Sequence, residues 1–401
     1  MNNEFLLIGL DGGATKVNGW TIEANNEEFE LGKYHYGVSY QEFTGFSDKF
    51  IATDIQRQLK EFQSGKIKPG KKELRQGEAY VEAAAEVVLQ LVRKSGLKKV
   101  LVGEGMPGLK TIDKRGIAVM ANGPRIIDYC DQMEKILRDY NIQFLKPMEA
   151  LGSDAFYCGI GEEYAREGQF KHMENSYYLG GGTGAADALK LKGHLVSLDN
   201  IKEWFVKTWE MKNKNDLSLE KCASAKGIQE IYGSFTDMTV AELNKKEIFP
   251  LNIREKALAD EKEAIKTFEI LAENLALLIY ERITTLFAGW QGVFSFVNPN
   301  RAIPVRQHPY LGTLLDSIII GQRLGDLFHV SKDDNLLWLP FFQRLSFLIM
   351  KSEVLDEEAK EYYCPGDSFN QKLLVISKLR EAPALGAAID AYLTYRNENN
   401  Y

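Results

Sequence analysis

The sequence predicts an α/β protein of two domains, and three observations support this prediction. The chain has 401 residues, which is more than a single hydrophobic core usually supports. Short apolar runs, typical of buried strands, alternate with longer stretches of helical periodicity. A glycine-rich turn with a threonine follows such a strand twice, at residues 12–15 and at residues 181–183.

The first strand and turn lie within residues 5–19, FLLIGLDGGATKVNG. The apolar run Phe5–Leu10 is too short for a helix and is bounded by glycine, so we expect a buried strand that forms a hairpin with Val17–Ile22. The glycines let backbone N–H groups approach a bulky anion, and Thr15 adds a hydroxyl donor. Asp11 offers a carboxylate that could hold a metal-bound water. An ordinary hairpin turn is the alternative explanation of the same residues.

The next elements continue the α/β order. Residues 23–72 are polar and rich in turns, with an amphipathic helix expected near residues 50–62. A helix is predicted from Gln76 to Ser95, ended by Gly96, and a buried strand over Lys99–Gly103. The order of two strands, a helix and a strand indicates an α/β domain.

A glycine- and proline-rich loop at residues 103–108 separates this strand from another, expected over Gly116–Asn122. Helices are predicted over Asp128–Tyr140 and Ala155–Ala165. Gly152-Ser153-Asp154 opens the second of these helices, and an N-cap is the simplest role for Ser153 or Asp154.

The second glycine-rich turn, Gly180–Gly184, connects the strand Ser176–Leu179 to a return strand over Ala188–Lys192. Two such turns, in separate α/β halves, suggest two phosphate-binding loops that face each other across a cleft. Farther along, residues 257–291 have the periodicity of a long core helix, and the aromatic run Trp338–Phe347 is expected in the core.

Composition narrows the functional classes. Hydrophobic residues make up 45% and charged residues 26% of the chain, as in ordinary globular proteins. A net charge of −7 argues against a nucleic-acid partner. No apolar run is long enough to span a bilayer, and no secretory leader is evident, so we expect no membrane partner. Four widely spaced cysteines suggest reduced thiols and a cytoplasmic protein.

Several stretches follow the order of motifs in the ROK family (repressors, open reading frames and kinases), and the sequence resembles that family over most of its length. The four phosphate and sugar stretches are IGLDGGATK, GEGMPGLKT followed by GIAVMANGP, GSDAFYCGIGE, and LGGGTGAADALKLKG. Looser matches are Leu219–Ser224, Ser317–Gln322 and Ala384–Ile389.

The resemblance implies the two-domain actin-like ATPase (ribonuclease H-like) fold, with a nucleotide in an interdomain cleft. We expect an N-terminal α/β domain over residues 1–115, completed by the C-terminal helix 384–401. Residues 116–383 would form a larger α/β domain with the second phosphate turn and the adenosine turn.

The resemblance also implies the site residues. Asp154 matches the aspartate of the family's N-D-A-N motif, which is its catalytic base. Asp11 would hold Mg²⁺ through a water. The implied ATP-binding residues are Asp11, Gly12, Gly13, Thr15, Lys16, Gly181, Gly182, Thr183, Gly184, Gly321 and Gln322. The implied substrate-binding residues are Pro107, Gly108, Asn122, Ser153 and Glu203.

The general base must accept a proton from the substrate hydroxyl, and it must therefore be ionised close to the transferred phosphoryl group. A carboxylate at a helix N-terminus is stabilised in its charged form by the helix dipole. A position at the start of the helix is thus compatible with both capping and catalysis at Asp154.

The chain departs from the family pattern at several places. The N-D-A-N motif becomes Ser153-Asp154-Ala155-Phe156, so both asparagines are missing. The E-x-G-H motif and the cysteine-rich zinc loop have no counterpart between His194 and Ser218. Gln322 stands where the adenosine turn has a second glycine, and residues 300–316 are an extra segment. We therefore expect no zinc site and poor use of glucose.

The predicted function is an ATP- and Mg²⁺-dependent carbohydrate kinase, which phosphorylates a hydroxyl of a sugar, a sugar-like molecule or a polyol. Catalysis would rest on positioning and charge neutralisation. The chain begins at the first strand with no helix-turn-helix, which argues against the repressor branch. The alternative is a nucleotide- or sugar-binding regulatory protein that has lost turnover. The sequence leaves open whether the chain forms a homodimer.

Overall fold

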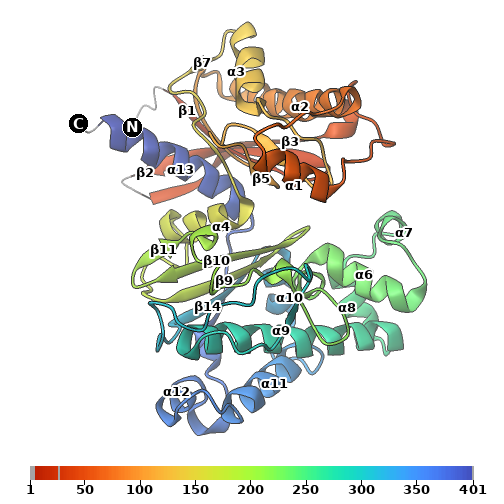
Figure 1. Cartoon of the computed structure of the whole chain (residues 1–401), viewed down its shortest axis with the longest axis vertical. Helices are drawn as coiled ribbons and strands as arrows, with labels where there is room; N and C mark the ends of the chain where they lie inside the picture. The colour runs from red at the N-terminus through yellow and green to blue at the C-terminus, as the bar shows by residue number, and fades with distance from the viewer. Residues whose placement is uncertain (1–4, 26–27, 400–401) are drawn as a thin grey trace. The chain divides into compact units, whose positions relative to one another are not determined.

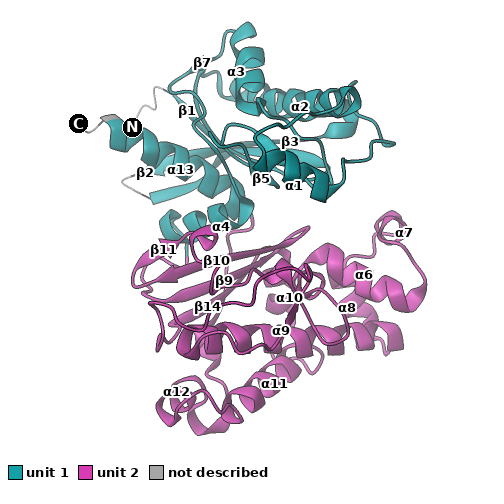
Figure 2. Cartoon of the chain, viewed as in Figure 1, with its two compact units in different colours: residues 1–168, 381–401 teal, residues 169–380 magenta. Residues whose placement is uncertain are grey.

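A computed structural model describes residues 5–25 and 28–399. The chain divides into two compact units, residues 1–168 together with 381–401, and residues 169–380 (Figure 2). The predicted boundary after residue 115 is therefore wrong, because the segment up to residue 168 adds strands and two helices to the first unit. None of the helices in the described part of the chain combines the length and the apolar character needed to cross a membrane.

The sheet of the first unit has the order β3-β2-β1-β4-β7, and β8 also pairs with β4. The hairpin predicted from the first motif is present: β1 runs antiparallel to β2 and parallel to β4. The bounds are β1 Leu6–Gly12, β2 Lys16–Asn25, β3 Glu28–Ser39, β4 Lys99–Gly105, β7 Gln143–Phe144 and β8 Leu151–Gly152. A separate hairpin joins β5 (Leu109–Lys110) and β6 (Ile117–Val119).

Strand β3 lies within the stretch that the sequence predicts to be polar and turn-rich. It is an edge strand, and most of its side chains remain partly or fully exposed. Since an edge strand needs few apolar residues, its sequence lacks the clear alternation that would reveal it.

Helices cover both faces of this sheet (Figure 1). On one face, α2 (Lys71–Ser95) and α3 (Tyr129–Asp139) share a core with the apolar residues of β1 and β4. On the other face, α13 (Ala382–Asn399) packs so closely that a Cβ on Gly9 would lie 1.9 Å from the carbonyl oxygen of Ala384. Helix α4 (Asp154–Tyr164) lies beside α13, and α1 is Ile55–Gln63. Helix α2 ends as predicted, at Gly96 with φ +77°.

The sheet of the second unit has the order β11-β10-β9-β14-β15. The second predicted hairpin is present, because β9 pairs antiparallel with β10, and β9 also pairs parallel with β14. The bounds are β9 Ser176–Gly181, β10 Ala185–Leu191, β11 His194–Val196, β14 Ser317–Gly321 and β15 Leu374–Ile376. A two-stranded pair joins β12 (Met211–Lys212) and β13 (Ser295–Phe296).

The core of the second unit is built on the long helix α9 (Lys262–Ala288), which packs against one face of this sheet (Figure 1). The long core helix predicted over residues 257–291 is α9, which begins at Lys262 because the chain turns at Asp260, whose φ of +62° is left-handed. Residues 257 and 258 belong to the end of the preceding helix α8 (Pro250–Leu258). The remaining helices are α5 Leu219–Ala223, α6 Ala225–Thr236, α7 Val240–Lys245, α10 Gln322–Val330, α11 Trp338–Met350 and α12 Glu357–Tyr363.

The aromatic run over α11 is buried only in part. Trp338, Phe341 and Phe342 belong to the core of the second unit, as the sequence predicts. Phe347 lies on the opposite side of the helix and is 54% exposed, so the prediction is wrong for this residue. An amphipathic helix keeps one face toward solvent, and the run of aromatic letters hides that division.

Candidate active site

The DGGAT turn connects β1 to β2 and is held by two buried tyrosines. The Gly13 N–H donates to the carbonyl oxygen of Lys16 over 2.9 Å. The Tyr40 hydroxyl donates to the Gly13 carbonyl over 3.1 Å, and the Tyr80 hydroxyl donates to the Ala14 carbonyl over 2.9 Å. The two rings are stacked with centroids 3.7 Å apart. The turn is therefore fixed by hydrogen bonds from Tyr40 and Tyr80, two residues that no sequence motif indicates.

The two glycines of this turn have different reasons to be glycine. A Cβ on Gly12 would lie 2.0 Å from the Met106 sulfur, so any side chain there would require Met106 to move. A Cβ on Gly13 would meet only the Lys16 carbonyl oxygen, at 3.4 Å. Thr15 and Lys16 are exposed at the end of the turn, where a bound anion could reach them.

Parallel pairing brings the two predicted carboxylates to one edge of the sheet. Asp11 at the end of β1 is in register with Gly105 of β4, and Gly105 is in register with Gly152 of β8. Asp154 follows β8 directly as the first residue of α4. In parallel sheets, ligands bind outside the carboxyl ends of the strands. Asp11 and Asp154 lie at such an edge.

The capping question is settled in favour of Ser153. Its hydroxyl accepts a hydrogen bond from the Phe156 N–H over 3.3 Å, so Ser153 is the N-cap of α4. The Asp154 carboxylate has another environment: its Oδ1 atom is buried and has no hydrogen-bond partner. Phe156 is 38% exposed, which places an apolar surface on the first turn of this helix.

Both carboxyl groups are harder to ionise than usual. Burial raises the pKa of Asp154 to about 6, opposed by the positive charge of Lys110 and by the N–H of Asp154 itself. Burial also raises the pKa of Asp11 to about 8, and the carboxylates of Asp154 and Glu381 raise it further, against the charge of Lys16. A charge on Asp154 thus disfavours ionisation of Asp11.

Lys110 braces the loop that carries two predicted substrate residues. Its ammonium group donates to the carbonyl oxygens of Met106 and Gly108, over 2.6 Å and 2.9 Å. Gly108 has φ +90°, and a Cβ there would lie 2.3 Å from the Val119 carbonyl oxygen, so backbone geometry alone requires glycine. The preceding residue, Pro107, is partly buried.

Glu104 is a fully buried acid behind this edge. It accepts a hydrogen bond from the Tyr129 hydroxyl over 2.6 Å, while its second oxygen is buried without a hydrogen-bond partner. Burial raises the pKa of Glu104 to about 8, although Tyr129 and Lys110 oppose the shift. A charged residue inside the apolar strand KVLVGEG was the signal that could have identified it.

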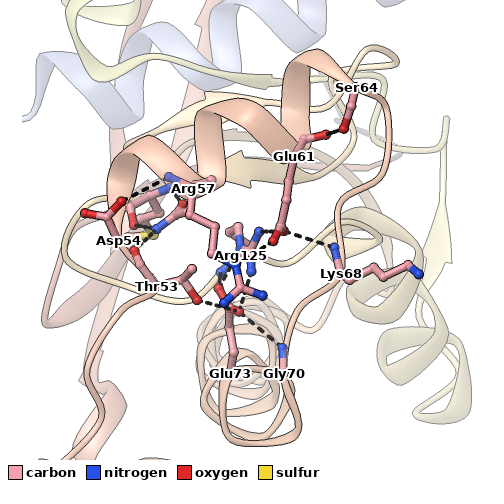
Figure 3. A network of polar contacts seen from close by, with 11 residues as sticks. Thr53, Asp54, Arg57, Glu61, Ser64, Lys68, Gly70, Glu73 and Arg125 are labelled. Atoms are coloured by element: carbon pink, nitrogen blue, oxygen red, sulfur yellow. Dashed lines mark hydrogen bonds and ion pairs between the residues drawn. The ribbon is translucent and has the colours of Figure 1, made fainter.

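Arg125 is the centre of a charge network with Glu61 and Glu73 (Figure 3), and this network lies three residues from Asn122 in the sequence. The Arg125 guanidinium donates to both oxygens of Glu73, over 2.8 Å and 2.9 Å, and also pairs with Glu61 of α1. Gln58 exchanges two hydrogen bonds with the backbone of Met120, of 2.8 Å and 3.1 Å. Asn122 is exposed between these two attachments, so its backbone is held on both sides.

The second glycine-rich turn is held within the second unit. A Cβ on Gly181 would lie 2.3 Å from the Ala223 carbonyl oxygen, and one on Gly184 would lie 2.8 Å from a carboxylate oxygen of Glu220. The Gly182 N–H donates to the Gly184 carbonyl over 3.0 Å. Thr183 is exposed at its end. The turn keeps its shape through contacts with α5.

The predicted adenosine turn is crowded by protein side chains. A Cβ on Gly321 would lie 2.4 Å from the hydroxyl oxygen of Tyr178, and one on Gly180 would lie 2.7 Å from the same atom. These glycines thus make room for the Tyr178 ring. Gln322 follows with φ +56°. An approach of Gly321 to adenosine stays a prediction.

The extra segment 300–316 is pinned onto residues 203–210. Glu203 has an exposed side chain, and its carbonyl accepts from the Val305 N–H over 2.9 Å. The Arg301 guanidinium lies 3.1 Å from a carboxylate oxygen of Glu210. The His308 ring stacks on Trp204 with centroids 4.1 Å apart, and burial lowers the pKa of His308.

Within residues 5–25 and 28–399, no group of three or more histidine, cysteine or acidic side chains is arranged to hold a metal ion. All four cysteines are buried free thiols. His194 is exposed and begins β11.

Comparison with known proteins gives structural matches only. No family model and no curated protein sequence matches the chain. A ROK family glucokinase from Streptomyces griseus, solved with glucose and AMPPNP, matches with a TM-score of 0.56 at 14% identity, over 97% of this chain and 99% of that one. The ROK hexokinase from Thermus thermophilus matches with a TM-score of 0.54 at 14% identity, over 98% and 100%.

A ROK family transcriptional regulator, described as a homologue of the E. coli MLC protein, matches with a TM-score of 0.53 at 11% identity. The match covers 97% of this chain and 79% of the regulator. At such identities the matches establish the fold and leave activity undetermined. The chain therefore has the ROK fold, an actin-like ATPase fold shared by sugar kinases and by a transcriptional regulator.

Proposed function

We propose that this chain is a kinase that transfers the γ-phosphoryl group of ATP to a hydroxyl group of a sugar or sugar-like small molecule. The observation that carries the proposal is the position of Asp154. Its carboxylate lies at the N-terminus of α4, at the carboxyl edge of parallel strands, with a buried oxygen that has no hydrogen-bond partner. An acceptor held in this way suits a general base that takes the proton of a substrate hydroxyl.

The surroundings of Asp11 suit ATP with Mg²⁺. Burial and two neighbouring carboxylates disfavour the charged form of Asp11, and a divalent cation would relieve that repulsion. Asp11 would hold the ion through a water, and the ion would neutralise charge on the phosphates. Thr15 offers a hydroxyl to a phosphate from the exposed end of the supported turn. In the second unit, Gly182 and Thr183 offer a second such turn.

The substrate would be positioned by the segment around Asn122 and by the loop that Lys110 braces. The structure of the Streptomyces griseus protein with glucose and AMPPNP supports a sugar and a nucleotide as the two ligands. Ser153 and Phe156 replace two amides of the N-D-A-N motif, so we propose a ligand other than glucose, with a less polar face toward α4. A second candidate function is binding without turnover, which the crowded turn at Gln322 and the regulator match favour.

An ATP-consumption assay over a panel of sugars, sugar derivatives and polyols tests the proposal, with Asp154→Asn as the matched variant. On the accepted substrate, Asp154→Asn should lose about 10²–10⁴ in turnover, the usual contribution of a positioned base. It should bind AMPPNP with unchanged affinity. Near-wild-type turnover in Asp154→Asn would show that Asp154 is not the base. Ligand binding without turnover across the panel would favour the regulator.

A further inference from the structure

Gln322 has an unusual backbone conformation at the junction of β14 and α10. Its φ is +56°, in the left-handed region that favours glycine over residues with a side chain. The backbone of Gln322 forms an isolated parallel bridge with Gly181, and this bridge ties the conformation to the end of β9. A side chain kept in a glycine-like backbone conformation points to a functional constraint on that residue, which the contacts of the side chain define.

The side chain of Gln322 extends over the second glycine-rich turn. A Cβ on Gly182 would lie 3.2 Å from Oε1 of Gln322 and 4.0 Å from its Nε2, and a Cβ on Gly180 would lie 3.0 Å from the same Oε1. The Cβ positions of Gly180 and Gly182 both lie next to this one oxygen atom, so the missing side chains of the two glycines leave one shared space. The amide of Gln322 occupies it over Gly182, and over Gly180 it shares the space with the Tyr178 hydroxyl, 2.7 Å from the Gly180 Cβ position.

We propose that the Gln322 amide is a plug that sets the nucleotide affinity of this chain: it occupies the space over Gly180 and Gly182 and must rotate away before a phosphate group can reach the turn. This inference rests on the proposed function, since it takes the second turn to be a phosphate site. An open state that is only partly populated lowers the apparent affinity by the populated fraction. Removal of the side chain therefore strengthens binding.

Three variants separate the plug from a direct contact to phosphate. Gln322→Gly removes the side chain and suits the left-handed backbone, and we expect it to bind AMPPNP with Mg²⁺ about ten-fold more tightly than the wild type, a modest change in the open fraction. Gln322→Ala should bind more tightly than the wild type as well. Gln322→Glu keeps the size and adds a negative charge, so it should bind more weakly.

Glu247→Gly is the matched control for relief of backbone strain. Glu247 is exposed, lies between α7 and α8, and has the same φ of +56°. A glycine at either position should raise the melting temperature, because both remove a side chain from a left-handed residue. Only Gln322→Gly should change the affinity for AMPPNP.

Isothermal titration calorimetry of the full chain with AMPPNP and Mg²⁺ gives the answer. Equal or weaker binding by Gln322→Gly, beside measurable binding by the wild type, overturns the plug and leaves the nucleotide site in place. Tighter binding by both Gln322→Gly and Glu247→Gly overturns it too, because the effect would then come from the backbone. If neither the wild type nor Gln322→Gly binds, the nucleotide site and the plug both fail.

Discussion

Asp154 Oδ1 lies directly above Gly105, so that a Cβ on Gly105 would come within 2.9 Å of this oxygen. The carboxylate of Asp154 therefore lies close to β4, although 49 positions in the sequence separate the two residues. Gly105 provides the space in which Oδ1 of Asp154 is buried without a hydrogen-bond partner.

Gly105→Ala should displace the Asp154 carboxylate and lower turnover by about 10²-fold, the loss that a misplacement of about 1 Å can cause. The measurement is kcat on the substrate found in the panel. Gly70→Ala is the control, because Gly70 has no atom within 4 Å of its Cβ position and should keep its activity. If Gly105→Ala were as active as Gly70→Ala, the position of the carboxylate would not govern the reaction.

Asp11→Asn should stabilise the protein more at pH 8 than at pH 5 in the absence of Mg²⁺. Asp11 has a pKa raised from 3.8 to about 8, mainly by burial, so the folded state holds this proton between these values and the unfolded state does not. The contribution of Asp11 to stability is therefore lost as the pH rises through this window. Melting temperatures measured against pH for both proteins test this.

Asp113→Asn serves as a control, because the pKa of Asp113 is lowered whereas that of Asp11 is raised. Hydrogen bonds from Thr111 and from the Arg115 N–H lower the pKa of Asp113, so its carboxylate stabilises the fold at neutral pH and loses this effect in acid. A difference between Asp11→Asn and wild type that stayed constant from pH 5 to pH 8 would contradict the raised pKa of Asp11.

Lys110→Met should shift the acidic limb of the pH profile of kcat/KM to higher pH. The positive charge of Lys110 lowers the pKa of Asp154, and without this charge the base loses its proton only at a higher pH. Loss of the two hydrogen bonds to Met106 and Gly108 should also raise KM. Lys110→Arg keeps the charge and should keep the acidic limb in place; an unshifted limb in Lys110→Met would exclude this role.

Arg125→Met should destabilise the first unit by about 3–5 kcal/mol, because it leaves the buried carboxylate of Glu73 without its partner. Urea unfolding followed by fluorescence measures the loss. The double variant Glu73→Gln/Arg125→Met removes the unpaired charge and should recover part of it. Arg57→Met breaks an exposed ion pair of Glu61, for which about 1 kcal/mol or less is expected. Equal losses in Arg125→Met and Arg57→Met would contradict the buried network.

The elements that the sequence predicts correctly are those that local patterns define. The β1–β2 and β9–β10 hairpins follow from apolar runs next to glycine-rich turns, and the end of α2 follows from Gly96. The ROK resemblance likewise rests on such local motifs, and the structural matches bear out the fold. Local patterns succeed here because the backbone preference and the burial of each segment act together.

Only the tertiary structure decided how distant segments combine. Asp11 lies beside Gly105 because β1 and β4 pair in parallel, and Lys110 acts on Asp154 because a loop folds back to their edge. The unit boundary at residue 168 depends on strands that join the first sheet late in the sequence. Likewise, Gly180 and Gly321 leave space for the ring of Tyr178, a contact that no motif reveals. Pairing and side-chain contact between residues far apart in sequence leave no periodicity in either segment, and so they become visible only in three dimensions.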